Sequence, residues 1–485
     1  MIAAVIRMRY SAAGGGTGGK KKEEPVIVPD IPAPELTMVR LSDGAETPMK
    51  DLDAKIESGE MTEEQAYGMI VEMTFGQDKM EDVPEIDGKL FISVRRIVIP
   101  DGYDRMPSVY ECPALEEITV SNTVREPAYV SDCPKLRALT IGSGLEDFNP
   151  VIGCPDVEIR ISEDNQALKT QNGMVMTTDE TRIMQYFGKD RTVTIPDSVM
   201  SIGEEAFIGC SSLMSISVGA ENASYSSVNG LLLSKDGETL IQGVNGDVTI
   251  PDSVTRIGPY AFSYHSGLTS VTIPDGVTNI GNNAFEGCSR LTSVAIPGSV
   301  TSIGYAAFHD CSGLTSVTIP DGVTNIAASV FSRCNGLTSV TMPNSVKSIE
   351  WGAFSGCSGL TSVTIPDGVT NIGEIAFSDC SGLTSVAMPN SVKSIGNMAF
   401  YGCSSLTDVT IPDSVTSIGN SAFFCCNNLS TVNMENHTME YIRNMGNFSW
   451  GLGAYLDTEE KEHYFEMTIH CSDGDVIINP PETIN

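Results

Sequence analysis

The chain has 485 residues, 41% of them apolar, and its 62 Asp and Glu outnumber 29 Lys and Arg, for a formal net charge of −33. This acidic balance excludes nucleic acid as a partner and argues against anionic membrane surfaces, because phosphates are bound through clustered cations. No apolar run approaches the roughly 20 residues that cross a bilayer, so membrane insertion is not expected. The apolar content supports a large core, but at this length several domains or an elongated array are expected.

The first segment, residues 1–35, is predicted to be a flexible tether. Its short apolar start is followed, and not preceded, by Arg7 and Arg9, so it gives no clear signal peptide. A Gly-rich stretch, three lysines and spaced prolines come next. Gly-rich chain is flexible and Pro-rich chain is extended, so neither is expected to build a packed core.

Residues 36–90 are predicted to form a small N-terminal adaptor or cap. Thr62 and Gln65 match a capping box, in which two side chains satisfy the first free amides of a helix. Apolar residues then follow at helical spacing, at Ala66, Met69, Ile70 and Met73. We expect this helix to cover the open end of the array that follows.

That array is defined by a period of 23 residues. Prolines recur at this step from Pro251 to Pro412, and phenylalanines recur at the same step from Phe262 to Phe423. Such a period is typical of a solenoid, and 23 residues are too few for the four strands of a propeller blade. Burial within one unit cannot offset the entropy of fixing its backbone, so the units must stack and share one continuous core.

Each unit is predicted to contain one parallel strand and a short helical turn. Val271 and Ile273 alternate with polar residues, which indicates a half-buried strand, and Pro274 removes the ladder donor that would continue it. Phe285 and Cys288 lie about one helical turn apart. Alternate units differ at the turn after the strand, and the resulting super-period of 46 residues indicates duplication in pairs.

The strand motif L-x-x-V-x-I-P, the following V-x-x-I-G and the motif A-F-x-x-C together resemble the BspA-like leucine-rich repeats of bacterial surface proteins. The resemblance implies a β-rich solenoid, a leucine-rich-repeat array with end caps. We place it over residues 91–434, with near-perfect units from about 248 onward. Upstream, degenerate units are marked by Cys112, Cys133 and Cys154 at a spacing of 21.

Two segments interrupt the period and look like the hairpin insertions of that family. One lies near 163–190. The other lies near 221–246 and is predicted to turn at Asp236 and Gly237, because Asp-Gly between apolar runs favours a tight hairpin.

The C-terminal segment, residues 435–485, is predicted to cap the last unit. A helix is expected over 438–448. Residues 466–471 and 476–478 read as strands on either side of a turn, which indicates a hairpin.

One column of the repeat is filled by cysteine, with His265 in the same place: Cys288, Cys311, Cys334, Cys357, Cys380, Cys403 and Cys426. Strands stack about 4.8 Å apart, and parallel side chains would keep their Cβ atoms near that separation, longer than the roughly 3.8 Å that a disulfide prefers. We therefore expect buried thiols that act as small hydrophobic groups. No His or Cys spacing indicates a metal site, a cofactor or a catalytic triad, so the protein is predicted to be non-enzymatic.

Comparison of the units with one another suggests where a ligand binds. The outward strand positions are nearly constant Ser and Thr, which discriminate little among ligands, whereas positions around the Ala-Phe pair vary and are rich in aromatic and charged residues, as interfaces are. The candidate ligand-binding residues, here called the variable stripe, are Tyr260, Tyr264, Tyr305, His309, Arg333, Trp351, Glu374, Tyr401 and Phe424. The alternative is neutral variation at exposed loop positions.

The sequence therefore predicts a repeat protein that binds proteins or other macromolecules. The family resemblance implies adhesion or a host or matrix interaction, and an extracellular or cell-surface location, although no clear signal peptide or anchor is seen. The alternatives are an intracellular protein-interaction scaffold and an attachment or fibre subunit of a larger assembly.

Overall fold

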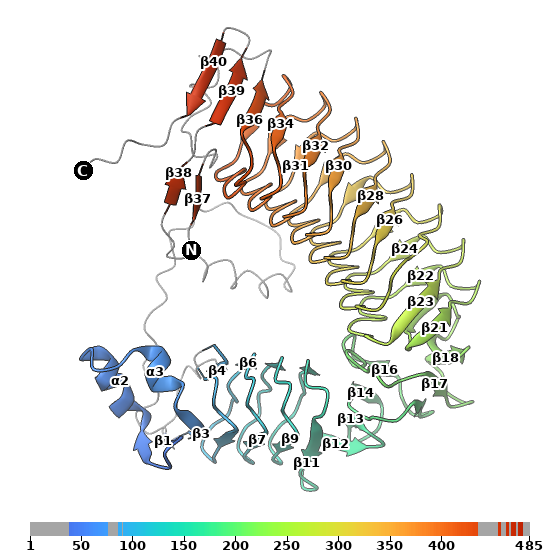
Figure 1. Ribbon diagram of the computed structural model, residues 1–485. Coiled ribbons are helices and arrows are strands. Elements are labelled where there is room, and N and C mark those ends of the chain that lie inside the picture. Colours follow the sequence, from blue (N-terminus) through green and yellow to red (C-terminus); the bar gives the residue numbers. More distant parts are fainter. Residues whose placement is uncertain are drawn as a thin grey trace, which may run out of the picture.

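The computed structural model describes residues 38–75, 86–89, 91–434, 454–456, 462–464, 467–471 and 474–478. The tether predicted over 1–35 and the helix predicted over 438–448 lie outside these residues. Figure 1 shows the described chain as an open C, in which a shorter N-terminal arm meets a longer C-terminal arm. No helix in the described part of the chain is long and apolar enough to cross a membrane.

The N-terminal arm is built on two ladders of mostly parallel strands. The first contains, in spatial order, β11 (Glu158–Ile161), β9 (Ala138–Ile141), β7 (Glu117–Val120), β5 (Arg96–Ile99), β3 (Ile70–Thr74), β1 (Met38–Leu41) and β2 (Glu46–Pro48). The second contains β10 (Val151–Ile152), β8 (Val130–Ser131), β6 (Val109–Tyr110) and β4 (Ile86–Asp87). Because β3 already pairs in parallel with β5, the stacked sheet reaches back to Ile70.

Two helices, α2 (Met49–Glu57) and α3 (Glu63–Tyr67), connect β2 to β3. The capping box is confirmed: the Thr62 amide donates to Gln65 Oε1 at 3.0 Å, and the Gln65 amide donates to Thr62 Oγ1 at 3.2 Å. The predicted helix was too long, since it ends at Tyr67 and both Ile70 and Met73 lie in β3. Strand partners on both sides of β3 outweigh the helical spacing of its apolar residues.

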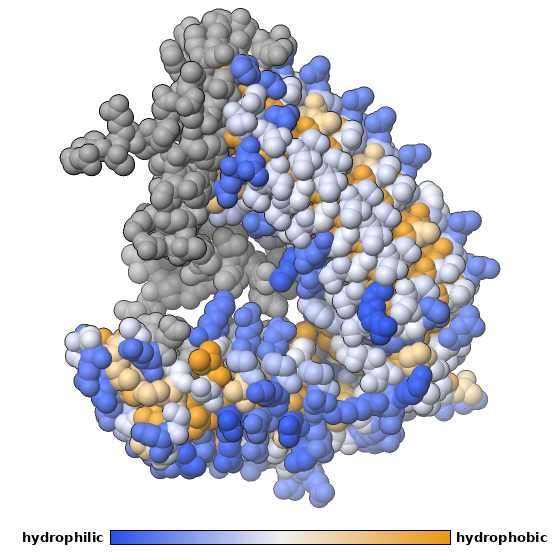
Figure 2. Space-filling model, in the orientation of Figure 1, coloured by the Kyte–Doolittle hydropathy of each residue, from blue (hydrophilic) through white to orange (hydrophobic). Residues whose placement is uncertain are grey.

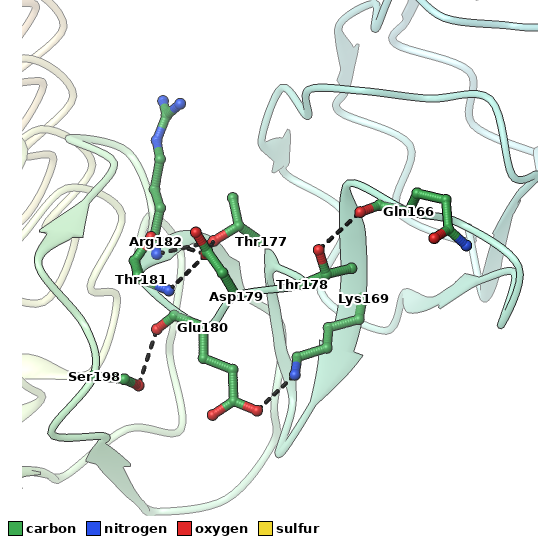
Figure 3. Close-up of polar contacts among 9 residues, drawn as sticks. All are labelled: Gln166, Lys169, Thr177, Thr178, Asp179, Glu180, Thr181, Arg182 and Ser198. Carbon is green, nitrogen blue, oxygen red and sulfur yellow. Dashed lines mark hydrogen bonds and ion pairs between the residues drawn. The ribbon is translucent and has the colours of Figure 1, made fainter.

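The first insertion joins the two arms. It consists of the antiparallel strands β12 (Leu168–Gln171), β13 (Met174–Thr177) and β14 (Arg182–Tyr186), and β14 pairs in parallel with β16 (Ser201–Ile202). Polar contacts hold its turn, as Figure 3 shows: Lys169 Nζ lies 2.6 Å from Glu180 Oε1, and Asp179 Oδ1 accepts from the Thr181 amide at 3.0 Å.

This insertion divides the hydrophobic interior in two. On β13, Met174 and Met176 are buried in the core of the C-terminal arm, whereas Val175 between them is buried in the core of the N-terminal arm. Ile183 and Met184 on β14 divide in the same way, because successive side chains of a strand point to opposite faces. The prediction of one continuous core was therefore wrong, since a sheet that is apolar on both faces separates two interiors.

In the C-terminal arm all units but the one at 291–296 contribute a strand to a first ladder, and these strands pair two by two. The parallel pairs are β15 (Thr192–Ile195) with β17 (Ser215–Val218), β21 (Gly246–Thr249) with β23 (Leu268–Thr272), β26 (Ser316–Thr318) with β28 (Ser339–Thr341), β30 (Ser362–Thr364) with β32 (Ser385–Ala387), and β34 (Asp408–Thr410) with β36 (Thr431–Met434). From β26 onward the pairs recur every second unit, which matches the 46-residue super-period.

A second ladder of two-residue strands runs beside the first. One run contains β22 (Arg256–Ile257), β24 (Asn279–Ile280) and β25 (Ser302–Ile303), and the next contains β27 (Asn325–Ile326), β29 (Ser348–Ile349), β31 (Asn371–Ile372), β33 (Ser394–Ile395) and β35 (Ser417–Ile418). The second insertion, β18 (Tyr225–Val228), β19 (Leu231–Ser234) and β20 (Thr239–Gln242), joins this ladder where β20 pairs with β22.

Beyond β36 the described residues form short strands. β39 (Met467–Cys471) extends the sheet of β36 in parallel and pairs antiparallel with β40 (Gly474–Ile478), so the predicted C-terminal hairpin is confirmed. A separate antiparallel pair joins β37 (Ala454–Leu456) to β38 (Glu462–Tyr464).

The predicted helical turn around each Ala-Phe pair is replaced by overlapping turns. The amide of Phe331 donates to the Ala353 carbonyl of the next unit at 2.9 Å, instead of to its own unit as a helix requires. Residues two before and two after the Phe are left-handed, as at Ser329 (φ 55°) and Arg333 (φ 61°). Left-handed residues interrupt a right-handed helix, so the backbone forms a third ladder between units.

Phenylalanine rings form a spine through the core of the C-terminal arm. Each ring from Phe262 to Phe423 stacks on the next, with centroids 5.0 to 5.6 Å apart. The neighbouring cysteines are free and buried, as predicted, and each donates to a Phe carbonyl of the preceding unit, as Cys357 Sγ does to Phe331 at 3.1 Å. Burial raises the pKa of the Cys357 thiol, so the neutral thiol is favoured.

Candidate binding surface

The variable stripe occupies four positions around the core phenylalanines. Three residues before a Phe lie Tyr305, Trp351 and Glu374; two before lies Tyr260; one after lie His309, Tyr401 and Phe424; two after lie Tyr264 and Arg333. All nine therefore lie on the turns that form the third ladder. The sequence placed them in one region, and the structure resolves that region into four parallel columns.

Hydrogen bonds between units fix the backbone beneath the stripe. The amides of Asn283, Phe285 and Gly287 donate to carbonyls of the next unit at 2.8 to 2.9 Å, and the carbonyls of Tyr305 and His309 are two of these acceptors. The same three bonds recur along the array. Side chains carried on such a backbone are presented in fixed order, which lowers the entropy lost on binding.

Exposure differs sharply among the stripe residues. Tyr264 and Tyr305 are 36% and 39% exposed, and Arg333 and Glu374 are also exposed. The others are only partly exposed: Tyr260, His309, Trp351, Tyr401 and Phe424.

At the N-terminal end of the stripe, Tyr264 is held by the next unit. Its hydroxyl donates to Glu286 Oε1 at 3.3 Å, and its ring lies over Gly287, where an added Cβ would come within 2.7 Å of the ring. Asn283 Nδ2 donates to Glu286 Oε2 at 2.7 Å. Burial raises the pKa of Glu286 to about 7. Sequence reasoning missed Glu286, although it shares the column of His309 and Tyr401.

The middle of the stripe is the most open. Tyr305 and Trp351 occupy the same column two units apart, with the small Ala328 between them. Arg333 lies in the unit between them, two residues after Phe331, with its Nε 3.9 Å from Asp310 Oδ1. Two large aromatic side chains flanking a small one, next to a mixed pair of charges, are well suited to a protein contact.

At the C-terminal end of the stripe, two of its aromatic side chains contact each other. The rings of Tyr401 and Phe424 stack with centroids 5.9 Å apart. Burial and the neighbouring Cys425 raise the pKa of Tyr401 to about 12. These two residues therefore pack on each other, as the neutral-variation alternative requires of some stripe aromatics.

In the described part of the chain, neither a metal-binding group of side chains nor either of the two cavities described below includes a residue of the stripe. Within the described ranges, no group of three or more His, Cys, Asp or Glu side chains is arranged to hold a metal ion. Two cavities, of about 420 and 380 Å³, lie outside the stripe and contain none of its residues. The stripe is thus an elongated surface with mixed character. In the view of Figure 2, much of the C-terminal arm is pale, of intermediate hydropathy.

Comparison with known proteins places this architecture. The family described as BspA type Leucine rich repeat region matches in 6 copies over residues 184–228, 245–361 and 325–446, just over half of the chain. No curated protein matches.

Solved structures of bacterial leucine-rich repeat proteins are also similar. One from Eubacterium ventriosum is 23% identical, with 73% of this chain and 90% of that chain covered and a TM-score of 0.42. One from Bacteroides ovatus is 21% identical, with 78% and 93% covered and a TM-score of 0.35. A leucine rich cell surface protein from Faecalibacterium prausnitzii is 20% identical, with 78% and 92% covered and a TM-score of 0.31.

Proposed function

Because this chain belongs to the family of BspA-type leucine-rich-repeat proteins, we propose that it is a protein-binding array whose ligand contacts the variable stripe. The observation that carries this proposal is the pair Tyr305 and Trp351, two aromatic side chains in one column on a backbone held by hydrogen bonds between units. Aromatic residues of this kind supply large contact areas at low entropic cost.

The outward face of the first ladder supports the choice of the stripe. Its exposed residues, such as Ser316, Thr318, Ser362 and Thr364, repeat with little change from unit to unit. A uniform hydroxyl surface offers a partner no distinct anchor, whereas the stripe changes at every unit. Specific recognition therefore favours the stripe.

Within this function we propose adhesion, through a host or matrix protein, as the biological role. The family resemblance supports it. Labelling of intact cells with an impermeant reagent would separate this role from an intracellular scaffold, because only a surface protein is labelled. Sedimentation of the native protein tests the third possibility, since a fibre or attachment subunit would sediment as a large assembly.

The stripe is tested by capture of matrix and cell-surface proteins on the immobilised full chain. The double variant Tyr305→Ala with Trp351→Ala should weaken capture at least about tenfold, since two aromatic anchors are lost. The matched control is Thr318→Ala with Thr364→Ala, also two units apart but on the outward strand face. Equal capture by the double variant and the unaltered chain would refute the proposal, as would equal loss in the control.

A further inference from the structure

The first ladder of the C-terminal arm is opened between β17 and β21. As between the other pairs of this ladder, β17 with β15 and β21 with β23 are not joined to each other as strands. The two units are joined just before β21, where the Asn245 amide donates to the Leu213 carbonyl at 2.9 Å. The turn of the second insertion at Asn229 and Gly230 lies beside β17, where the Gly230 carbonyl accepts the Ile216 amide at 2.8 Å. The insertion therefore occupies the edge of β17 and separates it from β21.

β21 keeps hydrogen-bonding groups on the side of this opening. The amides of Gly246 and Ile250 donate towards the β23 segment, to Gly267 and Thr272 at 3.0 and 3.1 Å. Since alternate residues of a parallel strand bond to opposite neighbours, the amides and carbonyls of Asp247 and Thr249 point towards the opening. These groups form a strand edge of the kind that accepts an added strand.

A cavity of about 420 Å³ lies at this edge. Its lining is mixed: Leu231, Val244 and Val248 are apolar but nearly fully buried, Asn229 and Asn245 are polar, and Met214 is apolar with 38% of its surface exposed. Thr249 lines the cavity from the edge strand itself. A strand added to β21 would therefore place an alternate side chain in this cavity, where Met214 offers it an exposed apolar contact.

The negative charge of Asp247 at this cavity favours an added strand that carries a positive side chain. Asp247 also lines the cavity, and its Oδ1 accepts from Thr269 Oγ1 and Ser270 Oγ, both at 2.7 Å. These hydrogen bonds lower the pKa of the Asp247 carboxyl, which keeps it charged. The residues lining the cavity include no Lys or Arg, so a positive side chain is the complement that this rim favours.

We propose that this opening, here called the insertion cleft, binds an extended peptide segment of a partner protein by adding a strand to β21. The segment carries an apolar residue that enters the cavity and a Lys or Arg that lies beside Asp247. Main-chain hydrogen bonds supply affinity in this mode, and the alternate side chains supply specificity. The cleft is separate from the variable stripe, so it forms a second binding site in the same array.

The test is a screen of the full chain against a synthetic library of fluorescent peptides, about six residues long, the usual length of a strand. Alternating apolar sequences with one Lys or Arg are expected to be enriched. Methylation of the peptide amides that pair with β21 should abolish binding. Met214→Ser should weaken binding about tenfold, and Asp247→Asn several-fold and only for the basic peptides. The matched control is Asp408→Asn, which changes the same strand position seven units away on β34.

The proposal is overturned if no peptide is enriched, if methylated peptides bind as well as unmethylated ones, or if the Asp408 variant loses as much binding as the Asp247 variant. Thermal unfolding of each variant, followed by circular dichroism, checks that the altered side chains leave the fold intact. The stripe variant Tyr305→Ala with Trp351→Ala should bind the selected peptides normally, so failure of one site is distinguishable from failure of the other.

Discussion

The Phe spine makes Phe354→Ala the most informative change to the fold. Its ring is completely buried and stacks on two others, Phe331 at 5.6 Å and Phe377 at 5.2 Å. A buried Phe→Ala change costs about 3–5 kcal/mol of unfolding free energy through lost burial and the cavity left behind. Each stacked aromatic pair adds about 0.5–1.5 kcal/mol beyond area. The expected loss therefore lies in the upper part of the range, at about 4–5 kcal/mol.

Phe423 provides a matched comparison, because among the residues that the structure describes it stacks on one ring, that of Phe400. Phe423→Ala should therefore cost about 1 kcal/mol less than Phe354→Ala. The assay is urea unfolding followed by circular dichroism, with hydrogen exchange to locate the loss around the altered unit. A loss below about 2 kcal/mol for Phe354→Ala, or a larger loss for Phe423→Ala, would refute the idea that each ring is supported from both sides.

Two further changes probe the repeat column of Cys357 and His265. Cys357→Val replaces the thiol with a somewhat larger apolar side chain and removes the donor to Phe331. Urea unfolding should register a loss of about 0.5–1.5 kcal/mol, and no loss would show that the thiol only fills space. Burial lowers the pKa of His265 to about 4, so the unfolded chain takes up the proton first and stability falls as the pH drops from about 6.5 to about 4. His265→Cys, which introduces the residue of the later units, should remove up to about 3 kcal/mol of this acid destabilisation. If the free energy of unfolding of the two proteins falls in parallel with pH, His265 is not the cause of the loss.

Much of the fold could be predicted from the repeat. A strict spacing of Phe and Cys requires equivalent environments in every unit, and stacking is the arrangement that provides them, as the spine from Phe262 to Phe423 confirms. The Thr62 capping box was also readable, because its hydrogen bonds involve only neighbouring residues.

Contacts between units could not be read from the same pattern. A spacing of three residues between Phe285 and Cys288 fits a helical turn as well as the overlapping turns found. Even Ile375 is left-handed (φ 48°), a conformation that local preference disfavours and that the bonds between units impose. The division of the core had a weak signal in the run Met174 to Met176, since consecutive apolar residues are expected in a strand buried on both faces.

The candidate surface was predictable in position but not in arrangement. Comparison of the units located the variable stripe, because core positions are nearly invariant and differences gather where the core makes no demand. The stacking of Tyr401 on Phe424 and the contact of Tyr264 with Glu286 depend on which columns face each other across units. The insertion cleft was missed for a related reason: it arises where the turn at Gly230 interrupts a ladder.

Distances across the first ladder test the stacked arrangement most directly. Nitroxide labels can be placed, on unnatural amino acids, at the same strand position in three units: Ser270, Ser362 four units later, and Asp408 six units later. Double electron–electron resonance should then give about 19 Å between Ser270 and Ser362 and about 29 Å between Ser270 and Asp408. Distances that grow in proportion to unit number are the expected result. A separation between Ser270 and Asp408 no longer than that between Ser270 and Ser362 would contradict the stack.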